Sequence, residues 1–337
     1  MKSILLSLVL LFSSLILPVN AHVQVAKSIK EKAILVCIPG LTESPFTFKK
    51  FADDMAHYGV STYGVNVQGY EICEPGKKQE KVDFNKTVSR VMETARMLRE
   101  KHPGVPVFLL GESTGGAIAL RAAALNTALF DGLICTVPTW QVRSTIKIGS
   151  LEVLDLTVCR KRQRGMAVNL VIKRATDKQD LRDALMAVES RRQRFSIVET
   201  AKFVRFMNAG PKTASQVKDL PVLFVDGLKD KVSKPTGCAF LFNKIASQKK
   251  TYILDAEAGH LICEEGQYSR PLLLGIRNWI NKAITKDFAT SPEAHLISSD
   301  SVKLADSIQI KKTFECAGVS PNAIVAKRYA GQISSAN

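Results

Sequence analysis

Residues Val105 to Arg121 read VPVFLLGESTGGAIALR, and the rest of the chain is arranged around them. A short apolar run, Val107 to Leu110, is followed at once by GESTG, which ends at Gly115. The next residues, Gly116 to Leu120, are small and apolar and suit a closely packed helix. The pattern predicts a strand, a sharp turn at Ser113 and a helix.

The GESTG turn has the G-x-S-x-G spacing of a nucleophile elbow. In such a turn the serine has a strained backbone, and glycine on both sides lets strand and helix pass without Cβ clashes. Ser113 is then lifted off the sheet edge, and the amide of Thr114 at the helix N-terminus points at a developing oxyanion. We interpret Ser113 as a candidate nucleophile, the alternative being a chance occurrence of the spacing.

The candidate base comes from the order of the chain. In a hydrolase with this elbow the acid and the histidine follow the serine. Of the five histidines only His260 and His295 come well after Ser113. His260 lies in a loop after a predicted strand, which can aim it, whereas His295 lies in a weakly periodic tail. His260 is therefore the predicted base.

Asp230 is the predicted acid, because it stands in a turn shortly after the buried run Pro221 to Val225. There its carboxylate can fix the imidazole tautomer and stabilise the imidazolium. Asp226, at the end of the strand, is a rival that more often caps or turns the backbone. Asp255, after the next strand, is a weaker rival. We predict that replacing Asp226 leaves most of the activity.

An oxyanion site needs two amide donors. Thr114 supplies one, and the loop after the apolar run Ala33 to Ile38 supplies the other. In that loop Gly40 allows close backbone approach, so the amide of Leu41 is the predicted donor. The alternative is that this loop is simply a turn.

Buried apolar runs alternate with helical periods on both sides of the elbow. This alternation predicts an α/β fold with a mostly parallel, doubly wound sheet. Between the two halves helical patterns dominate, which predicts an inserted helical lid beside the site. We expect five segments: a signal peptide at 1–21, the first part of the core at 22–140, the lid at 141–218, the second part of the core at 219–286, and a partly disordered tail at 287–337.

The N-terminus carries Lys2, an apolar stretch from Ile4 to Leu17 and a small-residue end at Ala21. This order is typical of a secretory signal peptide, so we expect a secreted or periplasmic protein cut after Ala21. An uncleaved membrane anchor is the alternative. An exported chain can form disulfides, and the odd count of 7 cysteines leaves at least one thiol unpaired. Cys37 and Cys135 fall in apolar runs and are expected to be buried.

The formal net charge is +16, and Lys and Arg cluster in the predicted lid. Such a cluster attracts an anionic membrane surface, although a charge run is most often a solvated face. It lacks the interleaved aromatic residues that stack on bases. The sequence also has no P-loop, nucleotide fingerprint or zinc spacing. We therefore expect no nucleic acid partner.

At these residues the chain resembles the monoacylglycerol lipase and lysophospholipase branch of the serine α/β-hydrolases, also grouped with serine aminopeptidase-like S33 hydrolases. The resemblance covers roughly Lys32 to Ile284 and rests on four stretches: CIPGLTES, HPGVPVFLLGESTGGAIAL, PVLFVDGLKDKV and AGHLICEE. It implies an α/β-hydrolase fold, a three-residue catalytic set, no metal or organic cofactor, and a helical lid that shapes an acyl pocket.

The chain departs from this family in three places. Pro39 stands where the family usually has histidine, which alters the rigidity of the loop but leaves its amides available. The sequence VQGY at 67–70 replaces a charged, glycine-rich turn, and the opening strand pair is shortened to what fits between His22 and Lys32. Lid sequences diverge most in such families, so the substrate does not transfer with the catalytic residues.

The sequence therefore predicts an exported serine hydrolase that cleaves carboxylic esters through an acyl-enzyme on Ser113. The resemblance implies a lipid-like ester of the monoacylglycerol or lysophospholipid type. A peptidase or an acyltransferase on the same fold is one alternative, and a catalytically silent binding protein with this fold is another.

Overall fold

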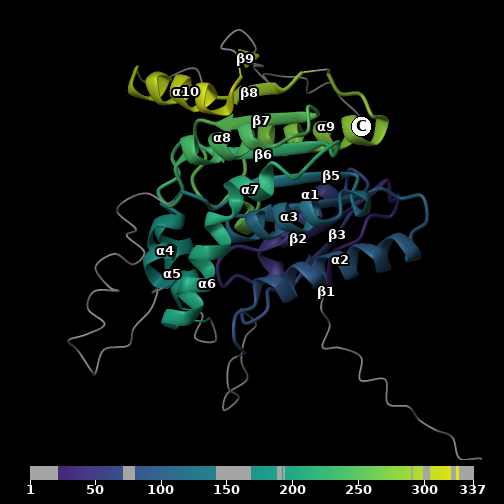
Figure 1. Ribbon diagram of the computed structural model, residues 1–337, viewed down its shortest axis with the longest axis horizontal. Coiled ribbons are helices and arrows are strands. Elements are labelled where there is room, and N and C mark those ends of the chain that lie inside the picture. The colour runs from purple at the N-terminus through teal and green to yellow at the C-terminus, as the bar shows by residue number, and fades with distance from the viewer. Residues whose placement is uncertain are drawn as a thin grey trace, which may run out of the picture.

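The computed structural model describes residues 22–70, 80–141, 168–187, 192, 194–289, 291–298, 304–319 and 324–325 (Figure 1). The predicted signal peptide at 1–21 and part of the predicted lid lie outside these residues. Among the helices that are described, none is both long and apolar enough to cross a membrane.

A mostly parallel sheet runs through the described part of the molecule, in the order β1-β3-β2-β4-β5-β6-β7-β8-β9. Only β1 is antiparallel to its neighbour, β3. The predicted fold class, an α/β-hydrolase fold with a mostly parallel, doubly wound sheet, is confirmed. The strands are β1 (His22–Ala26), β2 (Ala33–Ile38), β3 (Val60–Val65), β4 (Val107–Glu112), β5 (Gly132–Thr136), β6 (Val222–Gly227), β7 (Lys250–Asp255), β8 (Glu293–Ile297) and β9 (Ile324–Val325).

The central strands are buried on both faces because helices cover both sides of the sheet. Successive residues of β4 alternate between two hydrophobic clusters, with Val107 and Leu109 in one and Phe108 and Leu110 in the other. This is why β4 reads as a continuous apolar run rather than an alternating one. The strand that leads to Ser113 is thus fixed from both faces.

Helices α1 and α9 pack on one face of the sheet, and α2, α3 and α8 pack on the other. Asp83 caps the start of α2 by accepting a hydrogen bond from the amide of Lys86 at 2.9 Å. The helices of the core are α1 (Lys49–Ala56), α2 (Phe84–Lys101), α3 (Thr114–Leu125), α8 (Pro235–Lys244) and α9 (Arg270–Thr285), with short 3₁₀ turns η1 (Pro45–Phe48), η2 (Thr127–Leu129) and η4 (Glu264–Gly266).

The segment between β5 and β6 contributes four described helices. They are α4 (Val168–Ala175), α5 (Gln179–Met186), α6 (Ile197–Asn208) and α7 (Gly210–Ala214). Three of them, α4, α5 and α6, lie together to the left of the sheet in Figure 1, and the fourth, α7, packs between α3 and α8. We call this segment the helical insertion. Its helices α6 and α7 contact α3, so they stand next to the helix that follows Ser113.

A buried ion pair fastens the helical insertion to the core. Arg192 donates to the carboxylate of Glu199, which lies on α6, at 2.6 Å. Arg192 also donates to the carbonyls of Gly69 at 3.0 Å and Glu80 at 2.9 Å. Glu199 in turn accepts the amide proton of Val82 at 3.1 Å. The loop after β3 and the start of α6 are therefore held together.

The segment after residue 287, for which the sequence predicts a partly disordered tail, contains described elements. Glu293–Ile297 forms β8, which pairs in parallel with β7. Helix α10 (Leu304–Ala317) packs against α8, and its Phe314 meets Tyr252 edge to face with 5.9 Å between ring centroids. Burial of Phe314 is the physical reason that this weakly periodic segment folds onto the sheet.

Five cysteines are described, and all have free thiols: Cys37, Cys135, Cys238, Cys263 and Cys316. Cys37 and Cys135 are buried, as predicted. Burial raises the pKa of both thiols, so they behave as small apolar side chains.

Candidate active site

Ser113 occupies a one-residue turn between β4 and α3, with φ 54° and ψ −116°. A Cβ on Gly111 would lie 2.2 Å from the carbonyl oxygen of Gly115, and one on Gly115 would lie 2.0 Å from that of Ile38. No side chain fits at either position. The two glycines allow the close crossing that holds Ser113 at the carboxyl edge of the sheet.

The three predicted residues Ser113, His260 and Asp230 form a hydrogen-bonded chain. The Oγ of Ser113 lies 2.9 Å from Nε2 of His260, and Nδ1 of His260 lies 2.8 Å from Oδ2 of Asp230. The other carboxylate oxygen of Asp230 accepts the amide protons of Val232 at 2.6 Å and Ser233 at 2.9 Å. These bonds orient the carboxylate, which in turn orients the imidazole.

The bond to Asp230 sets the proton positions on His260. A carboxylate accepts, so Nδ1 of His260 carries the proton and Nε2 is left as an acceptor for the hydroxyl of Ser113. Burial disfavours the charged imidazolium, but the nearby carboxylates of Asp230, Glu112 and Asp226 outweigh it and raise the pKa of His260. His260 can therefore accept a proton from Ser113 and hold it.

The rival acids and the rival base have other partners. Asp226 lies near the end of β6 and accepts a hydrogen bond from the hydroxyl of Tyr252; burial raises its pKa to about 7. Asp255 accepts the amide proton of Glu257 at 2.9 Å. His295 lies on β8. The structure brings none of the three rivals into the hydrogen-bonded chain at Ser113.

The predicted oxyanion donors lie on two sides of Ser113. Thr114 starts α3, and Leu41 belongs to the loop after β2. A Cβ on Gly40 would lie 3.5 Å from Cβ of Ser113, so this loop passes directly over the nucleophile. Within the described residues the amides of Leu41 and Thr114 have no protein acceptor. Both remain available for an oxygen atom of a substrate.

Comparison with known proteins gives the family. The sequence model of the family described as serine aminopeptidase, S33, matches residues 29–267, which is more than half of the chain. The chain belongs to the serine aminopeptidase S33 family.

Relatives with curated names support the same placement. The monoglyceride lipase of Homo sapiens is 26% identical over 268 residues, which cover 77% of this chain and 86% of the relative. The monoglyceride lipase of Rattus norvegicus is 27% identical over 260 residues, which cover 75% of this chain and 84% of the relative.

Solved structures show the fold. A soluble variant of monoglyceride lipase from Saccharomyces cerevisiae has a TM-score of 0.64 at 18% identity and covers 80% of this chain and 92% of its own. Monoacylglycerol lipase from Paleococcus ferrophilus has a TM-score of 0.62 at 20% identity. The matched region covers 78% of this chain and 98% of the lipase chain.

In this S33-family chain two buried carboxylates brace the loops around the site, and sequence reasoning did not single them out. Glu112 accepts the amide protons of Ile262 at 2.8 Å and Cys263 at 2.7 Å, in the loop that carries His260. Glu264 closes that loop and faces the loop after β2. Burial raises the pKa of both, and the charge of Glu112 raises that of Glu264 further. The AGHLICEE stretch contains Glu264, but nothing in its spacing reveals the partner.

Thr139 is a third residue that sequence reasoning missed. Its Oγ1 lies 2.9 Å from Oγ of Ser113. Thr139 follows β5, which is the neighbour of β4 in the sheet. Because the carboxyl ends of parallel strands meet at one edge, the position after β5 lies near Ser113 once the strand order is known.

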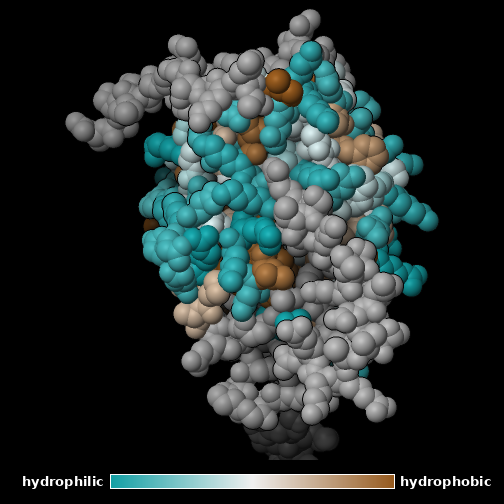
Figure 2. Space-filling model, turned by 90° about the vertical axis from the view of Figure 1, so that its left-hand side faces the viewer, coloured by the Kyte–Doolittle hydropathy of each residue, from teal (hydrophilic) through white to brown (hydrophobic). Residues whose placement is uncertain are grey.

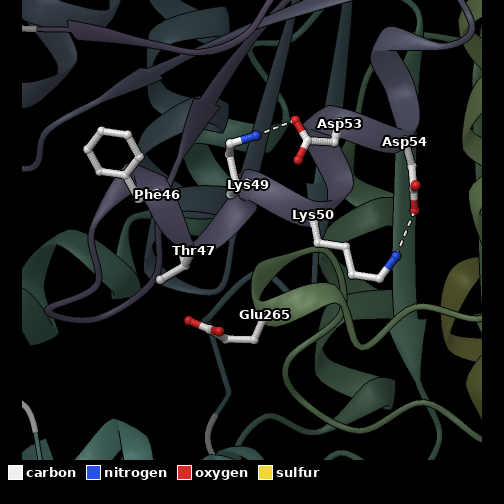
Figure 3. A pocket seen from close by; sticks show the side chains of 7 residues that line it. All are labelled: Phe46, Thr47, Lys49, Lys50, Asp53, Asp54 and Glu265. Atoms are coloured by element: carbon white, nitrogen blue, oxygen red, sulfur yellow. Dashed lines mark hydrogen bonds and ion pairs between the residues drawn. The ribbon is translucent and has the colours of Figure 1, made fainter.

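A hollow of about 470 Å³ is lined by residues of η1 and α1 and by Glu265 (Figure 3). Its lysines pair with acids one helical turn away, Lys49 with Asp53 and Lys50 with Asp54. Each of the two lysines is therefore paired with an acid of its own helix. Over the described part of the chain, no group of three or more His, Cys, Asp or Glu side chains is placed to hold a metal ion.

Proposed function

We propose that this S33-family chain is an exported hydrolase that cleaves lipid-like carboxylic esters through an acyl-enzyme on Ser113. It is a serine hydrolase of the lipase and esterase type. One observation carries the mechanism, namely the continuous hydrogen-bonded chain from Ser113 through His260 to Asp230. That arrangement activates a serine hydroxyl for attack on an acyl carbonyl.

In the first half of the reaction, Nε2 of His260 takes the proton of Ser113 as Oγ attacks the carbonyl carbon. The amides of Leu41 and Thr114 hold the oxyanion, and each is worth about 3 kcal/mol of transition-state stabilisation by analogy with other acyl-transfer sites. The imidazolium then gives its proton to the departing alcohol oxygen. The products are a free alcohol and an ester on Ser113.

In the second half, His260 takes a proton from a water molecule, whose oxygen attacks the acyl-enzyme. The imidazolium returns that proton to Oγ of Ser113, and the carboxylic acid leaves. Asp230 keeps the imidazole in the required tautomer in both halves and does not itself exchange a proton.

The relatives' names support a lipid-like substrate. Proteins called monoglyceride lipases align over most of this chain, so an ester of the monoacylglycerol or lysophospholipid type is the proposed substrate. The family description, serine aminopeptidase, supports a second candidate in which the acyl group comes from an amide. An acyltransferase differs only in the acceptor, because an alcohol then replaces water in the second half.

The surface of the helical insertion supports contact with an anionic lipid surface. Leu170 on α4 is 48% exposed, and Val198 on α6 is 65% exposed. Lys202 and Arg205 follow Val198 at helical spacing and are also exposed. Figure 2 shows this side of the molecule as mostly hydrophilic with separate hydrophobic patches. Such a surface suits weak contact with an anionic membrane.

Export remains a proposal from the N-terminal sequence. It predicts that protein recovered outside the cytoplasm begins at His22, which N-terminal sequencing would reveal.

A substrate panel tests the proposed function. Monoacylglycerols of increasing chain length, lysophospholipids and aminoacyl amides are compared at equal concentration, with and without anionic vesicles. Ser113→Ala serves as the matched control. We expect hydrolysis of the lipid esters that is lost in Ser113→Ala and increased by vesicles. Faster cleavage of the amides would overturn the ester proposal in favour of a peptidase.

A further inference from the structure

Thr139 makes two contacts with the candidate nucleophile. Its Oγ1 lies 2.9 Å from Oγ of Ser113, and its amide donates to the carbonyl of Ser113 at 3.1 Å. The side chain is buried, with 5% of the residue exposed. Thr139 is thus held against Ser113 by both backbone and side chain.

The hydrogen bonds among Ser113, His260 and Asp230 determine which of the two hydroxyls, that of Ser113 or that of Thr139, is the donor. Asp230 fixes the proton of His260 on Nδ1, so Nε2 accepts the proton of Ser113. The hydroxyl of Ser113 has only one proton, and that proton is already directed to His260. The hydroxyl of Thr139 must therefore be the donor in its contact with Oγ of Ser113.

The backbone before Thr139 is strained in a way that supports a functional role. Val137 has φ 42°, a conformation that β-branched residues rarely adopt. Its amide donates to the carbonyl of Val225 at 2.8 Å, which holds the strained residue at the end of β5. Strain of this kind costs about 1 to 3 kcal/mol and collects at active sites. Here it turns the chain so that Thr139 comes back to Ser113.

We propose that Thr139 is a catalytic residue whose hydroxyl donates a hydrogen bond to Oγ of Ser113 while that oxygen gains negative charge. The proton of Thr139 stays on its own oxygen, and the proton of Ser113 still goes to His260. The bond is strongest when Oγ carries most charge, which happens between the resting hydroxyl and the tetrahedral intermediate. By microscopic reversibility the same bond assists the departure of Oγ when the acyl-enzyme breaks down.

This inference rests on the proposed acyl-enzyme mechanism. It adds that Thr139 lowers the barriers to forming and breaking the bond at Oγ without binding the substrate. Removing its hydroxyl should therefore reduce kcat and the rate of acylation, whereas KM for a small ester should change little.

The test compares Thr139→Val, which removes the hydroxyl at nearly constant shape, with Thr139→Ser, which keeps it. Thr251→Val is the matched control, because Thr251 is also buried in the sheet and its hydroxyl has no partner among the described residues. Single-turnover acylation by a 4-nitrophenyl ester, KM and thermal unfolding are measured for each. Thr139→Ala replaces the valine variant if that one does not fold.

We expect Thr139→Val to acylate roughly ten- to hundredfold more slowly than wild type, the range for a hydrogen bond to a charged group. Thr139→Ser and Thr251→Val should stay close to the wild-type rate. A folded Thr139→Val with the wild-type rate would overturn the inference, and so would equal losses in Thr139→Val and Thr139→Ser. Failure of wild type itself to acylate would instead reject the proposed function.

Discussion

Glu264 accepts the amide proton of Gly40 with 2.9 Å between Oε1 and the amide nitrogen, although the two residues are 224 positions apart. The same oxygen accepts the hydroxyl proton of Thr47 at 3.0 Å. This bond joins the loop that carries His260 to the loop that carries Leu41. The candidate base and one candidate oxyanion donor are therefore linked through a single buried carboxyl group.

Replacing Glu264 tests this connection. Glu264→Ala leaves the amide of Gly40 buried without an acceptor, which costs about 1 to 3 kcal/mol of unfolding free energy. The loop is then free to shift, so kcat should fall as well. Glu264→Gln keeps an acceptor oxygen and should remain close to wild type in both respects. Urea unfolding and steady-state kinetics measure the two effects, and equal behaviour of the two variants would contradict the assigned role.

Asp230 and Asp226 offer a matched pair of substitutions on neighbouring acids. Asp230→Asn removes the acceptor that fixes the tautomer of His260, so kcat should fall by roughly 10⁴-fold, as for the equivalent change in serine proteases. Asp226→Asn keeps an oxygen for the hydroxyl of Tyr252 and should retain most of the activity. The kcat values of the two variants show which of the two aspartates is the acid that orients His260. If Asp226→Asn were the inactive one, the acid would be assigned wrongly.

The pKa of His260 determines how activity depends on pH. His260 must be neutral to take the proton of Ser113, and its pKa lies above the ordinary 6.5. At pH values below that raised pKa the imidazole is charged and cannot act as a base. We therefore expect kcat/KM to rise with pH through a midpoint above 6.5 and then to level off. A midpoint below 6.5 for wild type would show that burial outweighs the carboxylates.

The ion pair between Arg192 and Glu199 should make stability depend on pH. Burial opposes the charged carboxylate, but hydrogen bonds from Ser196 and Val82 and the charge of Arg192 lower the pKa of Glu199 to about 2. The folded state thus binds this proton less tightly than the unfolded state, whose ordinary pKa is 4.5. The ionised carboxylate of Glu199 therefore adds its full contribution to the unfolding free energy above pH 4.5, and this contribution is lost as the pH falls toward 2.

Glu199→Gln isolates this contribution. At pH 7 wild type should exceed the variant by up to about 3 kcal/mol in unfolding free energy, and the difference should shrink as the pH is lowered toward 3. Urea unfolding at several pH values gives both quantities. A difference that stays constant over this range would mean that the charge of Glu199 does not stabilise the fold.

The sequence was sufficient where local pattern determines structure. A buried strand, two glycines and a small-residue helix predicted the turn at Ser113. Chain order left His260 and His295 as candidate bases, and the predicted strand before His260 favoured it. The doubly wound sheet followed from the alternation of apolar runs and helical periods. These features depend on residues close together in the chain or on their order, so spacing alone reveals them.

Contacts that depend on the register between strands could not be predicted from the sequence. Glu112 and Thr136 are register partners on β4 and β5, and the hydroxyl of Thr136 donates to Glu112 at 2.9 Å. This register places the residues that follow β5, among them Thr139, next to Ser113. Strand β8 was missed for another reason. Of its five residues only Ala294 is buried, so this short strand carries little of the hydrophobic pattern that indicates a strand.

Covalent labelling of Ser113 tests the central claim most directly. Folded wild-type protein is treated with a fluorophosphonate probe, and the labelled peptide is identified by mass spectrometry. The account predicts one adduct, on Ser113, that is absent from Ser113→Ala and forms much more slowly in His260→Ala. A folded wild-type protein that stays unlabelled, or that carries the adduct on another serine, would contradict it.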